Sequence, residues 1–174
     1  MVYPADFILV GAMNPCPCGY YLDEHKECSC SPLQIKNYMG KISGPLVDRI
    51  DIHLAVDRIR PGDYRPAREP ECSAAIRSRV EKARALQAER YRGSGVRTNA
   101  QLDGRDVEKY CELTEKARGF LMRAIEELQL SGRAYHKIMK VGRTLADLEA
   151  AILVESRHVE EALQYRFLDR DRSE

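Results

Sequence analysis

The stretch LSGRAYHKIMKVGRTLADLE, residues 130–149, decides how the second half of the chain folds. On a helical wheel its apolar and basic side chains separate onto two sides, which predicts an amphipathic helix. The apolar side holds Tyr135, Ile138, Val141, Leu145 and Leu148, and the other side holds Arg133, His136, Lys137, Lys140 and Arg143. No acidic residue lies between positions 131 and 146. A solvated basic face is the plain interpretation of this second side.

Arg133 stands out within this stretch because of its position along the predicted helix. It falls in the first turn, where the helix dipole disfavours a cation. A cation at this place is explained if an anion such as a phosphate shares the site. Arg133 is therefore a candidate anion-binding residue.

Apolar residues at helical spacing also occur before and after this stretch, and they predict a helical bundle in residues 66–174. Four further helices are expected, marked by Ile76–Leu86, Val107–Cys111, Phe120–Leu128 and Val159–Phe167. A segment with three prolines and a glycine, RPGDYRPAREP at 60–70, reads as a linker before them. We therefore divide the chain into residues 1–65 and residues 66–174.

The first 65 residues have the pattern of an α/β domain. Phe7–Met13 is a continuous apolar run, typical of a strand covered on both faces, and Ile50–Val56 alternates as a second strand. Between them, SGPLVDR offers Ser43 as a cap and Pro45 near a first turn, so a short helix is expected. Two strands make no stable sheet alone, and this region resembles the tail of a larger α/β domain. The expected fold class is thus mostly α, with a truncated α/β remnant of two strands and a short helix.

Four cysteines form two Cys-x-Cys pairs in MNPCPCGYYLDEHKECSCSP, residues 13–32. Cys16, Cys18, Cys28 and Cys30 could close a tetrahedral zinc site, with His25 in the loop as a substitute for one ligand. Reduced thiols without metal are the alternative, and a site of four thiolates would be structural rather than catalytic. The two other cysteines, Cys72 and Cys111, are expected to be core residues.

Composition bounds the class of protein. Hydrophobic residues make up 44% and charged residues 32%, which is ordinary for a globular chain. The net charge of +1 gives no global reason to expect nucleic acid or an acidic membrane as a partner. No secretory signal and no run long enough for a membrane span are present in the sequence. We expect a cytoplasmic protein with reduced or metal-bound cysteines and no membrane partner.

Several ordered motifs together resemble one family. GAMNPCPCG, CSCSPLQIKNYMGKISGPLVDRIDIHL, LSGRAYHKIMKVGRTLADLE and VEEALQYR are similar to the C-terminal half of the Mg-chelatase-related AAA+ ATPases, in their competence-type ComM (YifB) branch. The resemblance implies that Asn14 is sensor 1, Arg49 the arginine finger and Arg133 sensor 2, with Lys137 as a second nucleotide contact. It also implies ATP and Mg²⁺ as ligands, a hexameric ring of identical subunits, and a helical lid in residues 66–174.

The resemblance also indicates what the sequence lacks. No G-x-x-x-x-G-K-[ST] loop and no Walker-B carboxylates occur in it, so we expect a fragment of an ATPase that hydrolyses no ATP alone. The cysteine cluster favours the DNA-remodelling branch, with DNA as partner and translocation or branch migration as its work. Two alternatives stay open: an ATPase subunit of magnesium insertion into a porphyrin, and a non-enzymatic zinc module that binds nucleic acid.

Overall fold

The structure is a computed structural model that describes residues 7–56 and 70–166. These residues are mostly helical, which confirms the predicted class. They belong to two compact units, Met1–Ser43 and Gly44–Glu174, which are described separately here. The first unit holds α1 (Pro32–Met39), and the second holds α2 (Gly44–Val47), α3 (Ser73–Arg90), η2 (Asn99–Gln101), α4 (Gly104–Tyr110), α5 (Glu115–Glu127), α6 (Gly132–Leu148) and α7 (Ser156–Gln164).

The five helices predicted for the second half are all present, as is the short helix near Pro45. Their beginnings follow from the sequence, because polar caps stand just before them. The side chains of Asp103, Thr114 and Ser131 each accept a hydrogen bond from a backbone amide in the first turn of α4, α5 and α6. Such caps satisfy amide groups that would otherwise lack a partner at a helix start.

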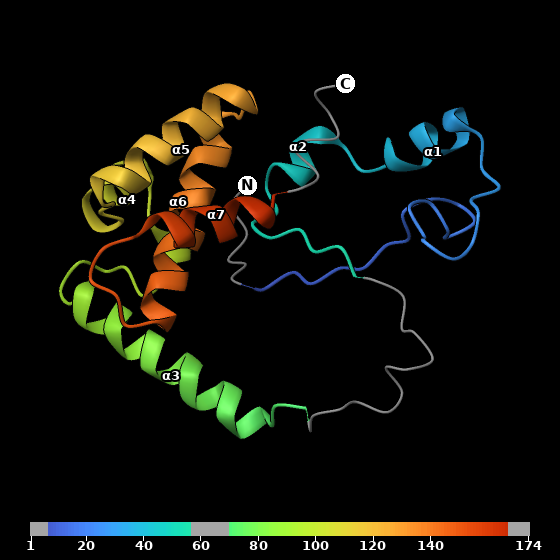
Figure 1. Cartoon of the computed structure of the whole chain (residues 1–174). Helices are drawn as coiled ribbons and strands as arrows, with labels where there is room; N and C mark the ends of the chain where they lie inside the picture. The colour runs from blue at the N-terminus through green and yellow to red at the C-terminus, as the bar shows by residue number, and fades with distance from the viewer. Residues whose placement is uncertain (1–6, 57–69, 167–174) are drawn as a thin grey trace, which may run out of the picture. The chain divides into compact units, whose positions relative to one another are not determined.

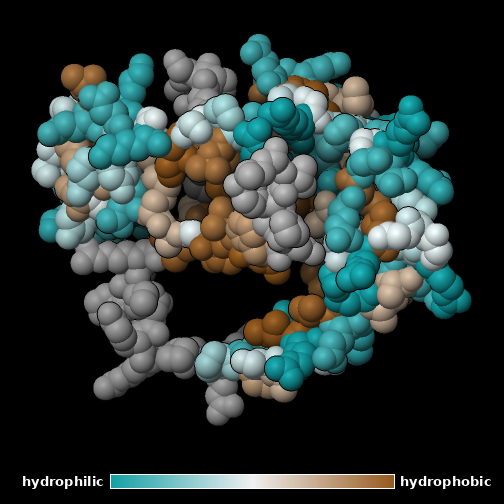
Figure 2. All heavy atoms as spheres, turned by 180° about the vertical axis from the view of Figure 1, so that it is seen from behind, coloured by the Kyte–Doolittle hydropathy of each residue, from teal (hydrophilic) through white to brown (hydrophobic). Residues whose placement is uncertain are grey.

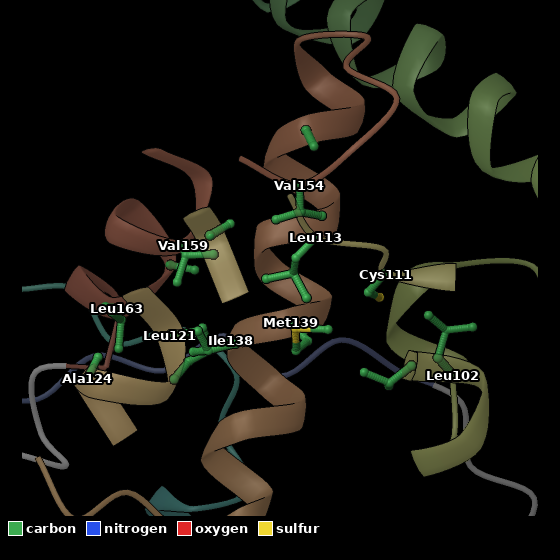
Figure 3. Packing of buried hydrophobic residues seen from close by; sticks show 14 of the residues in the cluster. Leu102, Cys111, Leu113, Leu121, Ala124, Ile138, Met139, Val154, Val159 and Leu163 are labelled. Carbon is green, nitrogen blue, oxygen red and sulfur yellow. The ribbon is translucent and has the colours of Figure 1, made fainter. Parts of the chain in front are cut away.

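Helix α6 is the central element of the second unit (Figure 1), where it packs against α3, η2, α4 and α7. Ile138 and Met139 of α6 are each 1% exposed. Figure 3 shows them among the buried side chains of the neighbouring helices, including Leu121 of α5 and Val159 of α7. Burying each such side chain stabilises the fold by about 1.5–3 kcal/mol, so this cluster supplies the main driving force for folding.

Two loops of the bundle are joined by a short parallel bridge between Leu113 and Val154. The amide of Thr114 donates to the carbonyl of Val154 at 3.0 Å, and the amide of Val154 donates to the carbonyl of Glu112 at 2.9 Å. The start of α5 is thereby fixed beside the link from α6 to α7.

A buried carboxylate, that of Asp147, connects α6 to α3 and η2. Its oxygens accept hydrogen bonds from Arg90 of α3 (2.9 Å), Asn99 of η2 (2.9 Å) and Arg143 one turn earlier on α6 (3.1 Å). Burial alone would raise the pKa of Asp147, but these hydrogen bonds and the charges of both arginines hold it below its ordinary value. The ionised form is therefore the one that the fold stabilises.

The prediction of a solvated basic face is wrong for Arg143, because this residue is only 1% exposed. Beyond α6 the chain reverses at Ala150, which has a φ of +55°, and the amide of Ala151 returns to the carbonyl of Ala146 at 2.8 Å. This reversal brings the carbonyls of Ala151 and Ile152 within 2.6 Å of the Arg143 guanidinium. A wheel cannot anticipate acceptors that arrive from the following loop.

The two predicted strands are not formed among the described residues, and this corrects the expected α/β remnant. Residues 7–13 and 50–56 have no ladder partner there, and a strand without a neighbour leaves its backbone groups unpaired. Their large apolar side chains lie at the surface. Figure 2 shows in brown the hydrophobic residues exposed on the face that it draws. The exposed members are Phe7, Ile8, Leu9, Val10, Met13, Ile52, Leu54 and Val56.

Some sequence predictions fall outside the described residues. Nearly all of the linker at 60–70, the boundary at residue 65 and Phe167 lie in positions 57–69 or 167–174. The division into residues 1–65 and 66–174 stays a prediction.

We predict that Asp147→Asn lowers the free energy of unfolding by about 3–5 kcal/mol, because it leaves buried arginine charge without its counter-ion. The folded pKa of Asp147 is depressed, so its stabilisation is present above the ordinary value of 3.8 and is lost as the pH falls through the lower folded pKa. Chemical denaturation at several pH values measures both effects. The exposed Glu160→Gln is the control. Equal stability of Asp147→Asn and the wild type would contradict this account of the network.

Candidate functional site

The four cysteines of the paired motif converge in the first unit. Their sulfur atoms all lie within 4.8 Å of one another. The Sγ–Sγ distances are 3.3 Å between Cys16 and Cys18, 3.7 Å between Cys16 and Cys28, and 3.5 Å between Cys18 and Cys28. The sequence prediction that these residues form one cluster is confirmed.

The local backbone explains how the first pair faces inward. The amide of Gly19 donates to the carbonyl of Cys16 at 3.0 Å in a tight turn, and Gly19 has a φ of +82°, which favours glycine. The amide of Tyr21 then donates to Sγ of Cys16 at 3.3 Å. Cys30 is followed directly by Ser31, which caps α1 through a capping box with Gln34. A turn and a helix start therefore hold the two pairs together.

The crowded sulfurs do not share negative charge equally. A hydrogen bond from the Tyr20 backbone is the main cause that lowers the pKa of Cys18 to about 5. The Cys30 backbone amide lowers the pKa of Cys28, but desolvation and the Cys18 and Cys16 sulfurs outweigh it and raise that pKa to about 12. Thiolates this close repel one another unless a cation lies between them.

The cluster fits a tetrahedral metal ion. With Zn–S bonds of about 2.3 Å, the edges of a zinc–sulfur tetrahedron are about 3.8 Å long. The sulfur separations of 3.3–3.7 Å approach this length, and the four cysteines supply a complete ligand set. The geometry is compatible with zinc in a closed site. His25 is exposed and is no member of the cluster.

The other two cysteines differ from each other. Cys111 is completely buried in the hydrophobic core, as predicted, and burial raises the pKa of its thiol to about 12. Cys72 is exposed at the N-cap of α3, so the prediction that it is a core residue is wrong. The buried residues of its helix, Ala83 and Gln87, lie further along, and the first turns of α3 are exposed.

Arg133 occupies the position that the sequence predicted, in the first turn of α6. It is exposed, and no carboxylate among residues 7–56 and 70–166 forms an ion pair with it. The N-cap Ser131 and the free amides around it face the same end of the helix. This end can bind an anion through both the guanidinium and the helix start.

Lys137 and Arg49 meet in the second unit, although 88 positions separate them in the chain. The ammonium of Lys137 donates to the backbone carbonyl of Arg49 at 2.8 Å and forms an ion pair with Asp51. The guanidinium of Arg49 is exposed and donates to the carbonyl of Pro45 at 3.0 Å. Neither Asp48 nor Asp51 forms an ion pair with it in the described part of the chain, which argues against a local salt bridge as its role.

Asn14 lies in the first unit, whereas Arg49 and Arg133 lie in the second. Its side chain is exposed and lies beside the turn of the cysteine loop, where a Cβ on Gly19 would be 3.9 Å from its amide nitrogen. The structure therefore brings Arg49 together with Lys137 in the second unit, and Asn14 together with the cysteine loop in the first.

Sequence reasoning missed the residues that hold the Arg49 segment and the α6 helix. Arg166 donates to the carbonyl of Ile50, and the amide of His53 donates to the carbonyl of Tyr165 at 2.7 Å. Asp147 and Arg90 were missed as well. The only signal in the sequence was the spacing of Arg143 and Asp147, which is one helical turn.

These features define a class: a helical bundle around one basic helix, preceded by a separate unit with a four-cysteine site. The sequence model for magnesium chelatase, subunit ChlI C-terminal, matches residues 70–166, and that for magnesium chelatase, subunit ChlI, matches residues 1–64. The chain belongs to this Mg-chelatase-related family, which confirms the resemblance found in the sequence.

Curated relatives extend beyond this chain. Competence protein ComM of Haemophilus influenzae is 40% identical over 169 residues, which cover 97% of this chain and 32% of the relative. YifB of Salmonella typhimurium is 38% identical over 98% of this chain and 33% of its own length. YifB of Escherichia coli is 36% identical over the same shares. The chain thus spans about a third of the length of these relatives.

Among the described residues, every helix is too short or too polar to cross a bilayer.

We predict that this chain, purified without chelator, contains one zinc ion per molecule. Replacing Cys28 with Ser should remove the metal, since three thiolates and a hydroxyl form a much weaker site. Elemental analysis and the absorption of the cobalt-substituted protein measure this. The exposed Cys72→Ser variant, outside the cluster, is the control. Purified wild-type protein with no metal and four freely titratable thiols in this loop would contradict the prediction.

Proposed function

We propose that this chain is the sensor and lid part of a hexameric AAA+ ATPase that remodels DNA. The proposal assigns sensor 1 to Asn14, the arginine finger to Arg49 and sensor 2 to Arg133. ATP with Mg²⁺ would be bound by the full-length protein, because this sequence contains no phosphate-binding loop of its own. The chain alone would hydrolyse no ATP.

The observation that carries the proposal is the exposed Arg133 at the start of α6. An arginine in a first turn is unfavourable for the helix unless an anion is bound there. No carboxylate in the described ranges neutralises it, and family membership supports a nucleotide phosphate as the anion. Arg133 would hold a phosphate of its own subunit by a charge-assisted hydrogen bond.

Arg49 and Asn14 would have different roles in the transfer of the phosphate. Arg49 would reach the γ-phosphate bound by the neighbouring subunit and stabilise the charge that develops on it, an effect worth factors of about 10³ or more. Asn14 would orient the attacking water through its amide. Lys137 was expected from the family resemblance to be a second nucleotide contact. Its ammonium instead binds the Arg49 carbonyl and the Asp51 carboxylate, so we assign phosphate binding within α6 to Arg133.

The four-cysteine unit would hold a structural zinc ion. Four thiolates leave no open coordination position, so the ion would fix the loop rather than take part in hydrolysis. Cys16, Cys18, Cys28 and Cys30 would place the loop from Gly19 to Glu27 as a stiff projection next to Asn14.

Two observations bear on the substrate of the motor. The name of the relative Competence protein ComM supports work on DNA, and the match to magnesium chelatase, subunit ChlI, favours metal insertion into a porphyrin as the second candidate. We prefer DNA, because Competence protein ComM is a relative with 40% identity over 97% of this chain, whereas the chelatase match is to the models of a whole family. A non-enzymatic zinc module that binds nucleic acid is the third possibility.

The test is ATP turnover by the full-length protein with and without DNA. We predict that DNA stimulates turnover and that Arg133→Ala lowers kcat/KM for ATP roughly ten- to hundredfold, the worth of one hydrogen bond to a charged group. The control is Arg123→Ala, an exposed arginine on α5.

Three results would count against the proposal. Turnover that responds to a porphyrin and not to DNA would favour the chelatase alternative. Nucleic-acid binding without any ATP turnover would favour the non-enzymatic module. Equal kcat/KM for Arg133→Ala and Arg123→Ala would exclude Arg133 as sensor 2.

A further inference from the structure

The segment after α2, residues 49–53, is held to the helical bundle by contacts from α6 and from the residues just beyond α7. From α6, Lys137 donates to the carbonyl of Arg49 at 2.8 Å. Just beyond α7, Arg166 donates to the carbonyl of Ile50, and the carbonyl of Tyr165 accepts from the amide of His53 at 2.7 Å. The contacts hold the backbone of the segment and leave the Arg49 side chain exposed.

The second contact of Lys137 determines which partners remain for Arg49. Asp51 lies two positions after Arg49 and would be its natural local counter-ion. Its carboxylate instead pairs with Lys137, whose side chain is only 17% exposed. By engaging Asp51, Lys137 leaves the Arg49 guanidinium with a backbone carbonyl, that of Pro45, as its partner. An arginine paired with a carboxylate would have to break that ion pair before it could meet a phosphate.

Lys137 also lies one helical turn after Arg133 on α6, and residues four apart share one side of a helix. The same helix therefore carries a candidate anion-binding residue, Arg133, at its start and, one turn later, Lys137, which contacts the backbone of Arg49. A rotation or shift of α6 would move the anchor of Arg49 with it.

We propose that Lys137 is a positioning residue that sets the orientation of Arg49 and keeps Asp51 away from it. The inference rests on the proposed function of Arg49 as the finger for a neighbouring subunit. It implies that binding of nucleotide at Arg133 in one subunit is transmitted through α6 and Lys137 to the finger that serves the next subunit. Lys137 touches no substrate in this arrangement.

The structural half of the proposal can be tested on this chain by amide hydrogen exchange. The reporters are the amide of His53, bonded to Tyr165, and that of Ile50, bonded to Leu46 at 3.2 Å. Lys137→Met keeps the length and apolar stem of the side chain and removes its charge. We expect at least tenfold faster exchange at both reporters, with unchanged exchange in α5 and α7.

Lys140→Met is the matched control, because Lys140 lies on the next turn of α6 and donates to the carbonyl of Ala100 at 3.1 Å instead. It should leave both reporters unchanged. Lys137→Arg, which retains a cationic donor, should restore most of the protection. Unchanged exchange in Lys137→Met, or equal acceleration in Lys140→Met, would overturn the proposal.

The functional half is read from the kinetics of the full-length ATPase. For Lys137→Met we expect kcat to fall tenfold or more while KM for ATP stays within twofold, since the finger acts on chemistry in the neighbouring site. A raised KM with normal kcat would identify Lys137 as a nucleotide contact and overturn the inference. The Arg49→Ala variant distinguishes a failure of the proposed finger role of Arg49 from a failure of the positioning role of Lys137. Normal turnover of Arg49→Ala would refute the finger itself, whereas a defective Arg49→Ala beside a normal Lys137→Met would refute only the role of Lys137.

Discussion

The buried carboxylate of Asp147 is the interaction on which the arrangement of the helical bundle depends. It accepts hydrogen bonds from Arg90 of α3, Asn99 of η2 and Arg143 of its own helix, so α3 and η2 have fixed positions relative to α6. Buried charge is costly unless every partner is present, and here both arginines and an amide supply those partners. The hydrophobic cluster drives the helices together, and this polar network determines how they are placed.

A fixed α6 matters because the helix carries Arg133 and Lys137. Arg133 at its first turn remains exposed, Lys137 one turn later holds the Arg49 segment, and Arg143 near its end is buried against the following loop. Successive basic residues of one sequence motif thus face three environments: solvent, another segment and the core. A single basic stripe in the sequence serves a candidate binding site, a tertiary contact and a structural network.

The sequence predicted elements with strong local signals and failed where distant groups decide the outcome. Helix periodicity located all five helices of the bundle, and cysteine spacing located the four-thiol cluster. Arg143 was misplaced because its acceptors, the carbonyls of Ala151 and Ile152, reach it only after the chain reverses. The apolar runs at 7–13 and 50–56 have the composition of strands. A strand also needs a neighbouring strand to pair with, and among the described residues no segment pairs with these runs. The contact of Lys137 with Arg49 has no local signal at all.

The central claim is that one ATP site is completed by residues of two subunits, with Arg49 supplied from the neighbour. The most direct test mixes full-length subunits carrying Arg49→Ala with subunits that lack the phosphate-loop lysine. The account predicts that each variant alone is inactive and that mixed rings recover part of the ATP turnover, because some interfaces then retain both groups. Mixed rings without any recovery, together with near-normal turnover of Arg49→Ala alone, would contradict it.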